Sequence, residues 1–292
     1  MSDNARWVRK FGSAADGPFQ VSITDAVDGW KHTSLRVAAL APGEGVRLDT
    51  GDSELIVVPL SGSPEVNAVR LAGRASVFAG PTDVAYVPRD TALTVHNPGP
   101  GTARVALCGA KARERKPFRH LAAADVPVEL RGAGTASREV RNFGVPGVLD
   151  ADSIIACEVV TPAGNWSSYP PHKHDEERPG AETALEEIYY FELESEADGV
   201  GDPVGYQRVY GTEDRPIDVL AEVRSGDVVL VPHGWHGPAM APPGYHLYYL
   251  NVMAGPGATR AWLICDDPAH GWVRGTWTGQ EVDPRLPIGG RR

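Results

Sequence analysis

Cysteines are scarce in this chain: only Cys108, Cys157 and Cys265 occur among its 292 residues, and no two of them form a CxxC pair. An odd number of cysteines without paired spacing argues against a disulfide framework. Each cysteine sits in an apolar run, and free cysteine is among the most buried residue types. We therefore expect three reduced thiols in the protein core.

Long apolar runs are also missing, and basic residues are in the minority. No segment approaches the about 18 consecutive apolar residues that a membrane helix needs, and the first ten residues lack the apolar stretch of a secretory signal. Lys and Arg total 28 against 38 Asp and Glu, which gives a net charge of −10. A negative chain repels phosphate backbones and anionic membranes. We expect a cytoplasmic protein that binds neither nucleic acid nor membranes.

Convincing amphipathic helices are scarce, whereas short strand-like runs are frequent. These runs are rich in β-branched and aromatic residues, and the 33 Gly and 25 Pro supply many turns between them. The clearest runs are Glu54–Val58, Asp83–Val87, Arg104–Cys108, Ile154–Val160, Glu187–Leu193, Tyr206–Tyr210, Asp227–Val231, His246–Met253 and Arg260–Cys265. This pattern predicts an all-β sandwich or barrel.

The chain contains an internal repeat that favours a duplicated barrel. Residues 82–88 and 226–232 share Asp, Val, Val and Pro at matching positions. Upstream of each copy lies a strand led by a glutamate, Glu54 in one and Glu187 in the other. A turn residue begins such a strand and the proline ends its pairing. We place a first barrel at residues 1–120, a linker at 121–137 and a second barrel at 138–292.

Six of the nine histidines lie between residues 172 and 270. His172 and His174 point to the same face of a strand, because side chains alternate along it. Glu187 begins the next strong strand, and His236 follows a strand that ends at a proline. Three imidazoles and one carboxylate suit Zn, Mn, Fe, Co or Ni. The sequence therefore predicts one metal site in the second barrel, and a first barrel that is metal-free because its residues 43–54 contain no histidine.

The identity of the fourth ligand has alternatives. Glu186 competes with Glu187, and we prefer Glu187 because Tyr189 then shares its inward face. His233 and His246 are alternative ligands or hydrogen-bonding partners of the ligands.

Several segments of the chain resemble a known family. Gly164–Pro171, His172-x-His174, the Glu187 strand and Gly226–His236 resemble the two motifs of the cupin superfamily. The resemblance to the 5-deoxy-glucuronate isomerases of myo-inositol catabolism is more specific, and it rests on Ser168–Asp175, Leu185–Tyr190, Gln207–Tyr210, Gly226–Pro232, Tyr248–Pro256 and Asp267–Trp272. These isomerases are bicupins related to the 4-deoxy-5-ketouronate isomerases, and the resemblance covers nearly the whole chain.

The resemblance implies two tandem jelly-roll β-barrels with one divalent metal ion in the C-terminal barrel. Zn²⁺ is our first expectation for the ion, with Mn²⁺ or Fe²⁺ as alternatives. The implied reaction is an aldose–ketose isomerisation of 5-deoxy-D-glucuronate to 5-dehydro-2-deoxy-D-gluconate. The small sugar acid is then the binding partner, and we expect a homo-oligomer. Rival readings are a cupin dioxygenase that uses Fe(II), another uronate isomerase, and a storage bicupin without catalytic activity.

Such an isomerisation moves a proton between adjacent carbons, so it needs an electrophile on the substrate oxygens and a general base near the carbon-bound proton. The sequence leaves the base open among Glu186, Tyr189 and Tyr248, with Asp175, His246 and a metal-bound hydroxide as further candidates. A guanidinium suits the substrate carboxylate. The candidates for substrate binding are Arg208, Arg178 and Lys173 for the carboxylate, and Asn251 for a hydroxyl.

Overall fold

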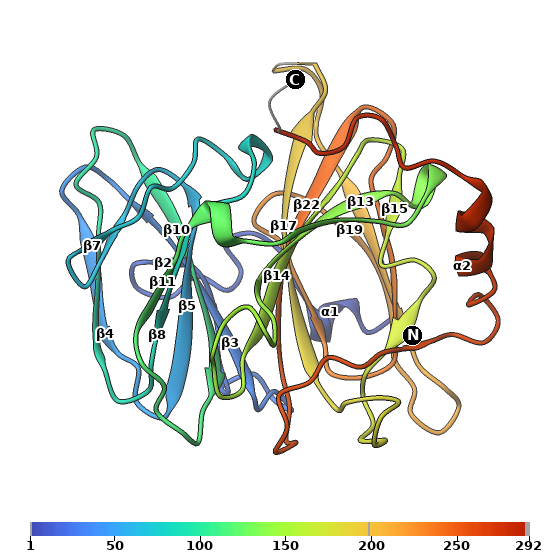
Figure 1. Ribbon diagram of the computed structural model, residues 1–292, viewed down its shortest axis with the longest axis horizontal. Coiled ribbons are helices and arrows are strands. Elements are labelled where there is room, and N and C mark those ends of the chain that lie inside the picture. The colour runs from blue at the N-terminus through green and yellow to red at the C-terminus, as the bar shows by residue number, and fades with distance from the viewer. Residues whose placement is uncertain (1, 198, 290–292) are drawn as a thin grey trace.

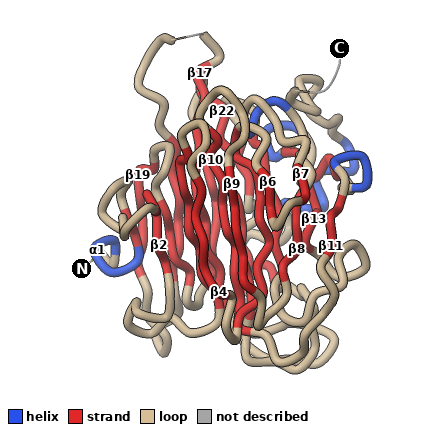
Figure 2. Tube along the Cα trace, turned by 90° about the vertical axis from the view of Figure 1, so that its left-hand side faces the viewer, coloured by secondary structure: helices blue, strands red, loops and turns tan. Residues whose placement is uncertain are grey.

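Strands dominate the fold of the computed structural model, which describes residues 2–197 and 199–289 (Figure 1). The helical elements are short turns at the periphery (Figure 2). They are α1 (Asn4–Trp7), α2 (Val273–Thr276) and the 3-10 turns η1 (Val77–Ala79), η2 (Ala123–Asp125), η3 (Gly134–Ala136) and η4 (Trp277–Gly279). None of the described helices is long and apolar enough to cross a membrane.

The first half of the chain forms two antiparallel sheets. The larger sheet has six strands in the order β11-β8-β5-β10-β3-β2, and the smaller has four in the order β4-β9-β6-β7. The larger contains β2 (Phe19–Ile23), β3 (Thr33–Leu40), β5 (Ser53–Ser61), β8 (Val84–Val87), β10 (Ala103–Lys111) and β11 (Arg119–Leu121). The smaller contains β4 (Gly45–Asp49), β6 (Glu65–Val66), β7 (Val69–Arg70) and β9 (Ala92–His96).

The second half is built in the same way from a seven-stranded and a six-stranded sheet. The seven-stranded order is β1-β20-β17-β22-β14-β13-β12; the other sheet has the order β19-β18-β21-β16-β23, with β15 also paired to β21. The first contains β1 (Val8–Arg9), β12 (Val128–Arg131), β13 (Arg138–Gly144), β14 (Ile155–Thr161), β17 (Glu186–Ser195), β20 (Val228–Val231) and β22 (Tyr245–Ala254). The second contains β15 (Trp166–Ser167), β16 (His172–Lys173), β18 (Gly205–Tyr210), β19 (Asp218–Val223), β21 (Trp235–Met240) and β23 (Cys265–Asp266).

The two larger sheets pack against each other between the two halves. Alternation along β5 shows this directly: Ile56 and Val58 belong to a core cluster that also contains Ile188 of β17, so they face the other half. Leu55 and Val57 belong to a second cluster that fills the interior of the first barrel. The strand is therefore apolar on both faces, as expected for a strand buried on both sides.

The all-β prediction is confirmed, and most predicted strands are present. The run at residues 260–264 is wrong as a strand, because only Cys265 and Asp266 pair there, in β23. Cys108 and Cys157 are buried free thiols as expected, but Cys265 is only half-buried, so the prediction of a third core thiol is wrong. The chain start also differs from the predicted layout, because β1 pairs with β20 in the second half; Figure 1 shows α1 and the end marked N within that half.

The register of the internal repeat is shifted by one residue from the comparison made on the sequence. Leu55 pairs with Val87 and Glu187 pairs with Val231, and each valine precedes the matching proline. Leu55 is thus the structural equivalent of Glu187, and Glu54 is the equivalent of Glu186. The position of the predicted carboxylate ligand is occupied in the first barrel by an apolar side chain of the core.

Candidate metal centre

Three histidines converge inside the second barrel. His172 on β16 pairs directly with His236 on β21, which brings both side chains to one face of the sheet. His174 follows β16, and its ring centroid lies 4.7 Å from that of His236. One ring nitrogen from each of the three lies within 4.8 Å of the others, and all three residues are buried. The His-x-His spacing and the distant histidine therefore meet as the sequence predicted.

The Glu187 carboxylate comes from the facing sheet and completes the cluster. Its Oε2 atom lies 3.0 Å from Nε2 of His174 and 3.1 Å from Nε2 of His236. Burial by itself would raise the pKa of Glu187, but the close approach of His174 and His236 outweighs it and lowers the pKa to about 2. Burial lowers the pKa of His172 well below its usual value, and the neighbouring His236 and His174 add to this effect. A carboxylate and a neutral imidazole are the forms that bind a cation.

The outward nitrogens of the histidines are held by backbone carbonyls. Nδ1 of His174 lies 3.3 Å from the carbonyl oxygen of Leu185, and Nδ1 of His236 lies 3.1 Å from that of Gly234. His172 hydrogen-bonds to the backbone of Pro170. A ring that donates its Nδ1 proton to a carbonyl presents the lone pair of Nε2 to the interior. This arrangement orients ligand atoms toward a common point.

The four side chains fit a divalent metal ion. Nε2 of His236 is buried and, although it lies close to Glu187, makes no well-aligned hydrogen bond. A buried polar nitrogen without an aligned partner is costly unless something else satisfies it. Nitrogen and oxygen donors in this number suit first-row transition ions. The type and the orientation of these donor atoms suit a divalent cation, and they are compatible with several metals.

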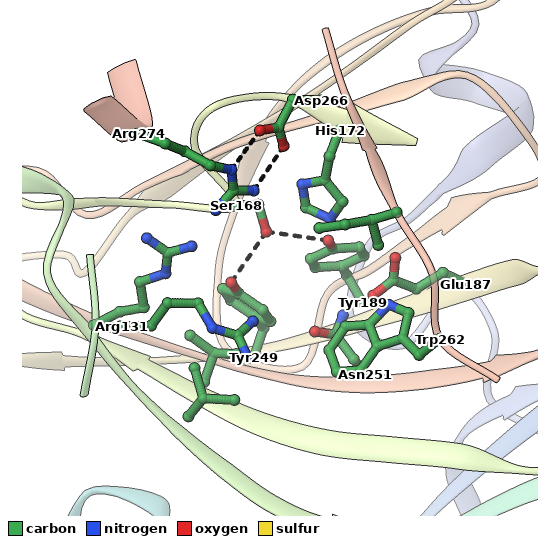
Figure 3. A pocket seen from close by; sticks show the side chains of 14 residues that line it. Arg131, Ser168, His172, Glu187, Tyr189, Tyr249, Asn251, Trp262, Asp266 and Arg274 are labelled. Atoms are coloured by element: carbon green, nitrogen blue, oxygen red, sulfur yellow. Dashed lines mark hydrogen bonds and ion pairs between the residues drawn. The ribbon is translucent and has the colours of Figure 1, made fainter. Parts of the chain in front are cut away.

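A cavity of about 330 Å³ adjoins the histidine cluster (Figure 3). Glu187 and His172 line one side of it, and Arg131 and Arg274 lie away from Glu187 in the view of Figure 3. The volume falls at the lower end of the range for small-molecule sites. The remaining lining residues are Arg138, Val140, Val159, Ser168, Tyr189, Tyr249, Asn251, Trp262, Ile264 and Asp266.

Three hydroxyl groups form a cluster in the cavity wall. Ser168 Oγ lies 3.2 Å from the hydroxyl of Tyr189 and 3.1 Å from that of Tyr249. Ser168 has a left-handed backbone with φ of 47°, and a Cβ at Gly237 would lie 1.8 Å from its carbonyl oxygen. Gly237 is therefore required for this close approach. The backbone geometry fixes the serine between the two phenols.

Two of the predicted catalytic residues lie outside the cavity. The carboxylate of Glu186 accepts hydrogen bonds from the backbone N–H groups of residues 31–33, on the opposite face of β17 from Glu187. Tyr248 donates to Glu158 at 2.6 Å, between the two larger sheets, where Glu158 also pairs with Arg74. Tyr189 is the predicted catalytic residue that lines the cavity.

The predicted carboxylate-binding residues also lie elsewhere, whereas Asn251 lines the cavity. Lys173 is paired with Asp175 at 2.7 Å and with Glu182 at 2.8 Å. Arg178 is half exposed and pairs with Glu182, and Arg208 pairs with an aspartate on β19. None of the three cations is among the residues that line the cavity within the described part of the chain.

Three other arginines, which the sequence analysis did not select, line the cavity: Arg131, Arg138 and Arg274. Arg131 and Arg138 come from the neighbouring strands β12 and β13, and Arg274 comes from α2 near the end of the chain. Arg131 lies in the segment taken as a linker, which instead forms an edge strand of the seven-stranded sheet. Arg138 begins β13, which also contains Glu139 and Arg141, so its charge alone did not single it out in the sequence.

Comparison with known proteins identifies close relatives over most of the chain. The model of the KduI/IolB family matches residues 7–273. The 5-deoxy-glucuronate isomerase of Geobacillus kaustophilus (strain HTA426) is 41% identical over 259 residues, which is 87% of this chain and 90% of the relative. The 5-deoxy-glucuronate isomerase of Bacillus subtilis (strain 168) is 38% identical over 257 residues, covering 86% and 91% of the two chains.

Solved structures give the same picture for the fold. An IolB-like protein from Salmonella typhimurium LT2 superposes with a TM-score of 0.81 at 33% identity, covering 91% of this chain and 98% of that chain. The oxalate decarboxylase of Lactobacillus farciminis superposes with a TM-score of 0.61 at 12% identity, covering 89% and 88%. The second likeness concerns the fold alone, and it agrees with the cupin class expected from the sequence.

Proposed function

This chain belongs to the KduI/IolB family, and from that premise we propose that it is an aldose–ketose isomerase that converts 5-deoxy-D-glucuronate to 5-dehydro-2-deoxy-D-gluconate. The named relatives at about 40% identity are 5-deoxy-glucuronate isomerases, and they match nearly their whole length. The reaction is an internal redox exchange: the aldehyde carbon is reduced to an alcohol while the adjacent alcohol carbon is oxidised to a ketone. It consumes no external oxidant.

The observation that carries this proposal is that one cavity of about 330 Å³ combines a metal-ligand set with many hydrogen-bond donors. His172, His174, Glu187 and His236 would hold the divalent metal. Such an ion supplies Lewis-acid polarisation of the carbonyl and hydroxyl oxygens of an aldose. The other walls offer phenols, an amide and guanidinium groups, which suit a polyhydroxylated acid.

Tyr189 and Tyr249 act as hydrogen-bond donors in this proposal. Burial raises the pKa of both phenols, so each keeps its proton at neutral pH. Their donors are positioned for the oxygens on which negative charge develops as the proton leaves carbon. Ser168 links the two hydroxyls and lets a proton pass between them. The ring centroid of Tyr189 lies 6.2 Å from that of His236, which places this phenol beside the proposed metal ligands.

We further propose the identity of the metal, the cellular location and the oligomeric state from the sequence. Zn²⁺ is the first choice for the metal, with Mn²⁺ or Fe²⁺ as alternatives. The protein is proposed to act in the cytoplasm as a homo-oligomer, on a small sugar acid, without a nucleic-acid or membrane partner. The role of Asn251 is to donate its amide to a substrate hydroxyl from the cavity wall.

The test is turnover of the purified protein with 5-deoxy-D-glucuronate, followed by NMR. We expect the aldehyde and hydrate signals to be replaced by signals of the ketone, without oxygen uptake in a parallel electrode measurement. Oxygen consumption with a different product would favour the dioxygenase. The absence of turnover in metal-loaded protein with every candidate metal would refute the proposed activity.

A further inference from the structure

Arg138 is a buried cation in the cavity wall without an acidic partner. Its exposed fraction is 5%, and among the described residues no carboxylate lies within ion-pair distance of its guanidinium. Its hydrogen bonds go to the carbonyl oxygens of Ala136 at 2.9 Å and Tyr169 at 3.5 Å. A buried charge without a counter-charge is costly, so a buried and unpaired arginine in a cavity wall is a candidate for binding an anionic ligand.

The two neighbouring arginines differ from Arg138 because each is already paired. Arg131 binds the carboxylate of Glu129 through two nitrogens at 2.9 and 2.7 Å. Arg274 binds Asp266 in the same two-pronged way. Their charges are neutralised locally, so the excess positive charge of the cavity belongs to Arg138. Burial lowers the pKa of Arg138 to about 10, which leaves it charged at neutral pH.

Arg138 lines the same cavity as the proposed metal ligands His172 and Glu187. A chain of polar groups leads from the metal ligands through Tyr189, Ser168 and Tyr249. Arg138 lines the cavity together with Tyr249, and its Nη1 atom lies 3.5 Å from the carbonyl oxygen of Tyr169, the residue after Ser168. In an open six-carbon uronate the aldehyde and the carboxylate are at opposite ends, with hydroxyls between them. The cavity offers metal ligands, hydroxyl groups and a guanidinium, which are suitable partners for an aldehyde, for hydroxyls and for a carboxylate.

We propose that Arg138 is the carboxylate-binding residue of this site, and that it selects acyclic sugar acids over neutral sugars of the same length. This assignment deepens the proposed function and rests on it for the identity of the substrate. Trp277 packs on the guanidinium, with 5.5 Å between the Arg138 Cζ atom and the ring centroid, and limits its rotation. A fixed planar fork binds a carboxylate through two parallel hydrogen bonds.

The first experiment measures binding without relying on turnover. D-gluconate and D-glucitol are matched acyclic probes that differ in a carboxylate against a hydroxymethyl group. We expect D-gluconate, and not D-glucitol, to raise the melting temperature of the metal-loaded wild type. In Arg138→Met the increase should be lost, while Arg208→Met, which removes a paired arginine outside the cavity, should retain it. Retention of the full gluconate effect in Arg138→Met, or no discrimination by the wild type, overturns the proposal.

The second experiment separates binding from a merely structural role. With 5-deoxy-D-glucuronate, Arg138→Met should raise KM by about 30-fold or more, as expected for a lost buried charge pair, and change kcat by less than about threefold. Its melting temperature without ligand should not fall, because the variant removes an uncompensated charge. Should Arg138→Met fail to fold, Arg138→Lys is measured instead. We then expect KM to rise at least about fivefold, because the point charge of lysine replaces the planar guanidinium. An unchanged KM in the variant that folds overturns the assignment.

Failure of this inference is distinguishable from failure of the proposed function. If the wild type turns over the uronate and the Arg138 variants have an unchanged KM, the isomerase activity stands and the assignment of Arg138 as the carboxylate-binding residue is refuted. If the wild type lacks turnover but binds D-gluconate in an Arg138-dependent way, Arg138 is supported as the carboxylate-binding residue and the isomerase activity is refuted.

Discussion

Glu54 and Glu186 occupy equivalent positions in the two barrels, and each carboxylate binds the backbone of the opposite half. Glu54 accepts hydrogen bonds from the N–H groups of residues 152–154 at 2.9, 2.6 and 2.7 Å. Glu186 accepts them from the N–H groups of residues 31–33 at 3.1, 2.7 and 2.7 Å. These segments lead into β14 and β3, respectively. Each glutamate thus links its own half to the backbone of the other half. The role of Glu186 in this arrangement is structural.

Replacing Glu186 should therefore weaken folding rather than chemistry. Glu186→Ala leaves three backbone donors without their charged acceptor, and we expect the free energy of unfolding to fall by about 3 kcal/mol. Glu54→Ala should cost a similar amount. Urea unfolding measures both, with the exposed Glu213→Ala as the control. At a temperature where the variant is folded, its metal content and kcat should equal those of the wild type; a large loss of kcat with unchanged stability would instead restore Glu186 as a catalytic group.

Removal of one histidine should empty the metal site. His174→Ala removes one of the converging nitrogens, so we expect elemental analysis to find less than a tenth of the wild-type metal and no measurable turnover. The matched control is His233→Ala, a half-buried histidine outside the cluster, which should keep its metal. The same loss is expected for His172→Ala. A full metal complement in either cluster variant contradicts the ligand assignment.

Two buried tyrosines provide a paired test of the cavity. Tyr189→Phe removes a hydroxyl that faces the substrate space, and we expect kcat to fall by about 100-fold with little change in stability. Tyr248→Phe removes a hydroxyl that donates to Glu158 between the sheets, so its kcat should remain near the wild-type value while its stability falls. Steady-state kinetics and thermal unfolding of both variants decide the matter. If Tyr189→Phe and Tyr248→Phe lose the same fraction of kcat, the proposal that only Tyr189 contributes to the chemistry is contradicted.

The buried ion cluster around Glu158 predicts a dependence of stability on pH. Burial alone would raise the pKa of Glu158, but Arg74 and Arg141 outweigh it and hold the pKa below its usual value. The unfolded state then binds more protons in acid than the folded state. The contribution of Glu158 to stability is present above the unfolded pKa, and it is lost as the pH falls through the folded pKa.

The variant Glu158→Gln removes this titration. At pH 7 we expect it to be less stable by about 3 kcal/mol, since Arg74 loses its buried carboxylate. Between pH 6 and pH 3 its stability should fall less steeply than that of the wild type. Urea unfolding at several pH values measures the slope, with the exposed Glu114→Gln as the control. Parallel curves for wild type and Glu158→Gln would mean that another group carries the acid sensitivity.

The sequence by itself determined the strand pattern and the spacing of the first two candidate ligands, His172 and His174, because both depend on local periodicity. The spacing of His172 and His174 and the punctuation by glycine and proline are short-range signals, and the structure has them as predicted. The all-β class follows for the same reason.

Only the tertiary structure decided which polar residues reach the cavity. A strand buried on both faces gives no sequence signal for its inward side, and a shift of one residue reverses every side chain. Glu186 and Glu187 are adjacent, yet one binds the opposite half and the other meets the histidines. Arg131, Arg138 and Arg274 are brought together from an edge strand, its neighbour and the chain end. Arg131 and Arg138 are direct partners on adjacent strands, whereas Arg274 reaches them only through the packing of a segment more than 130 residues away.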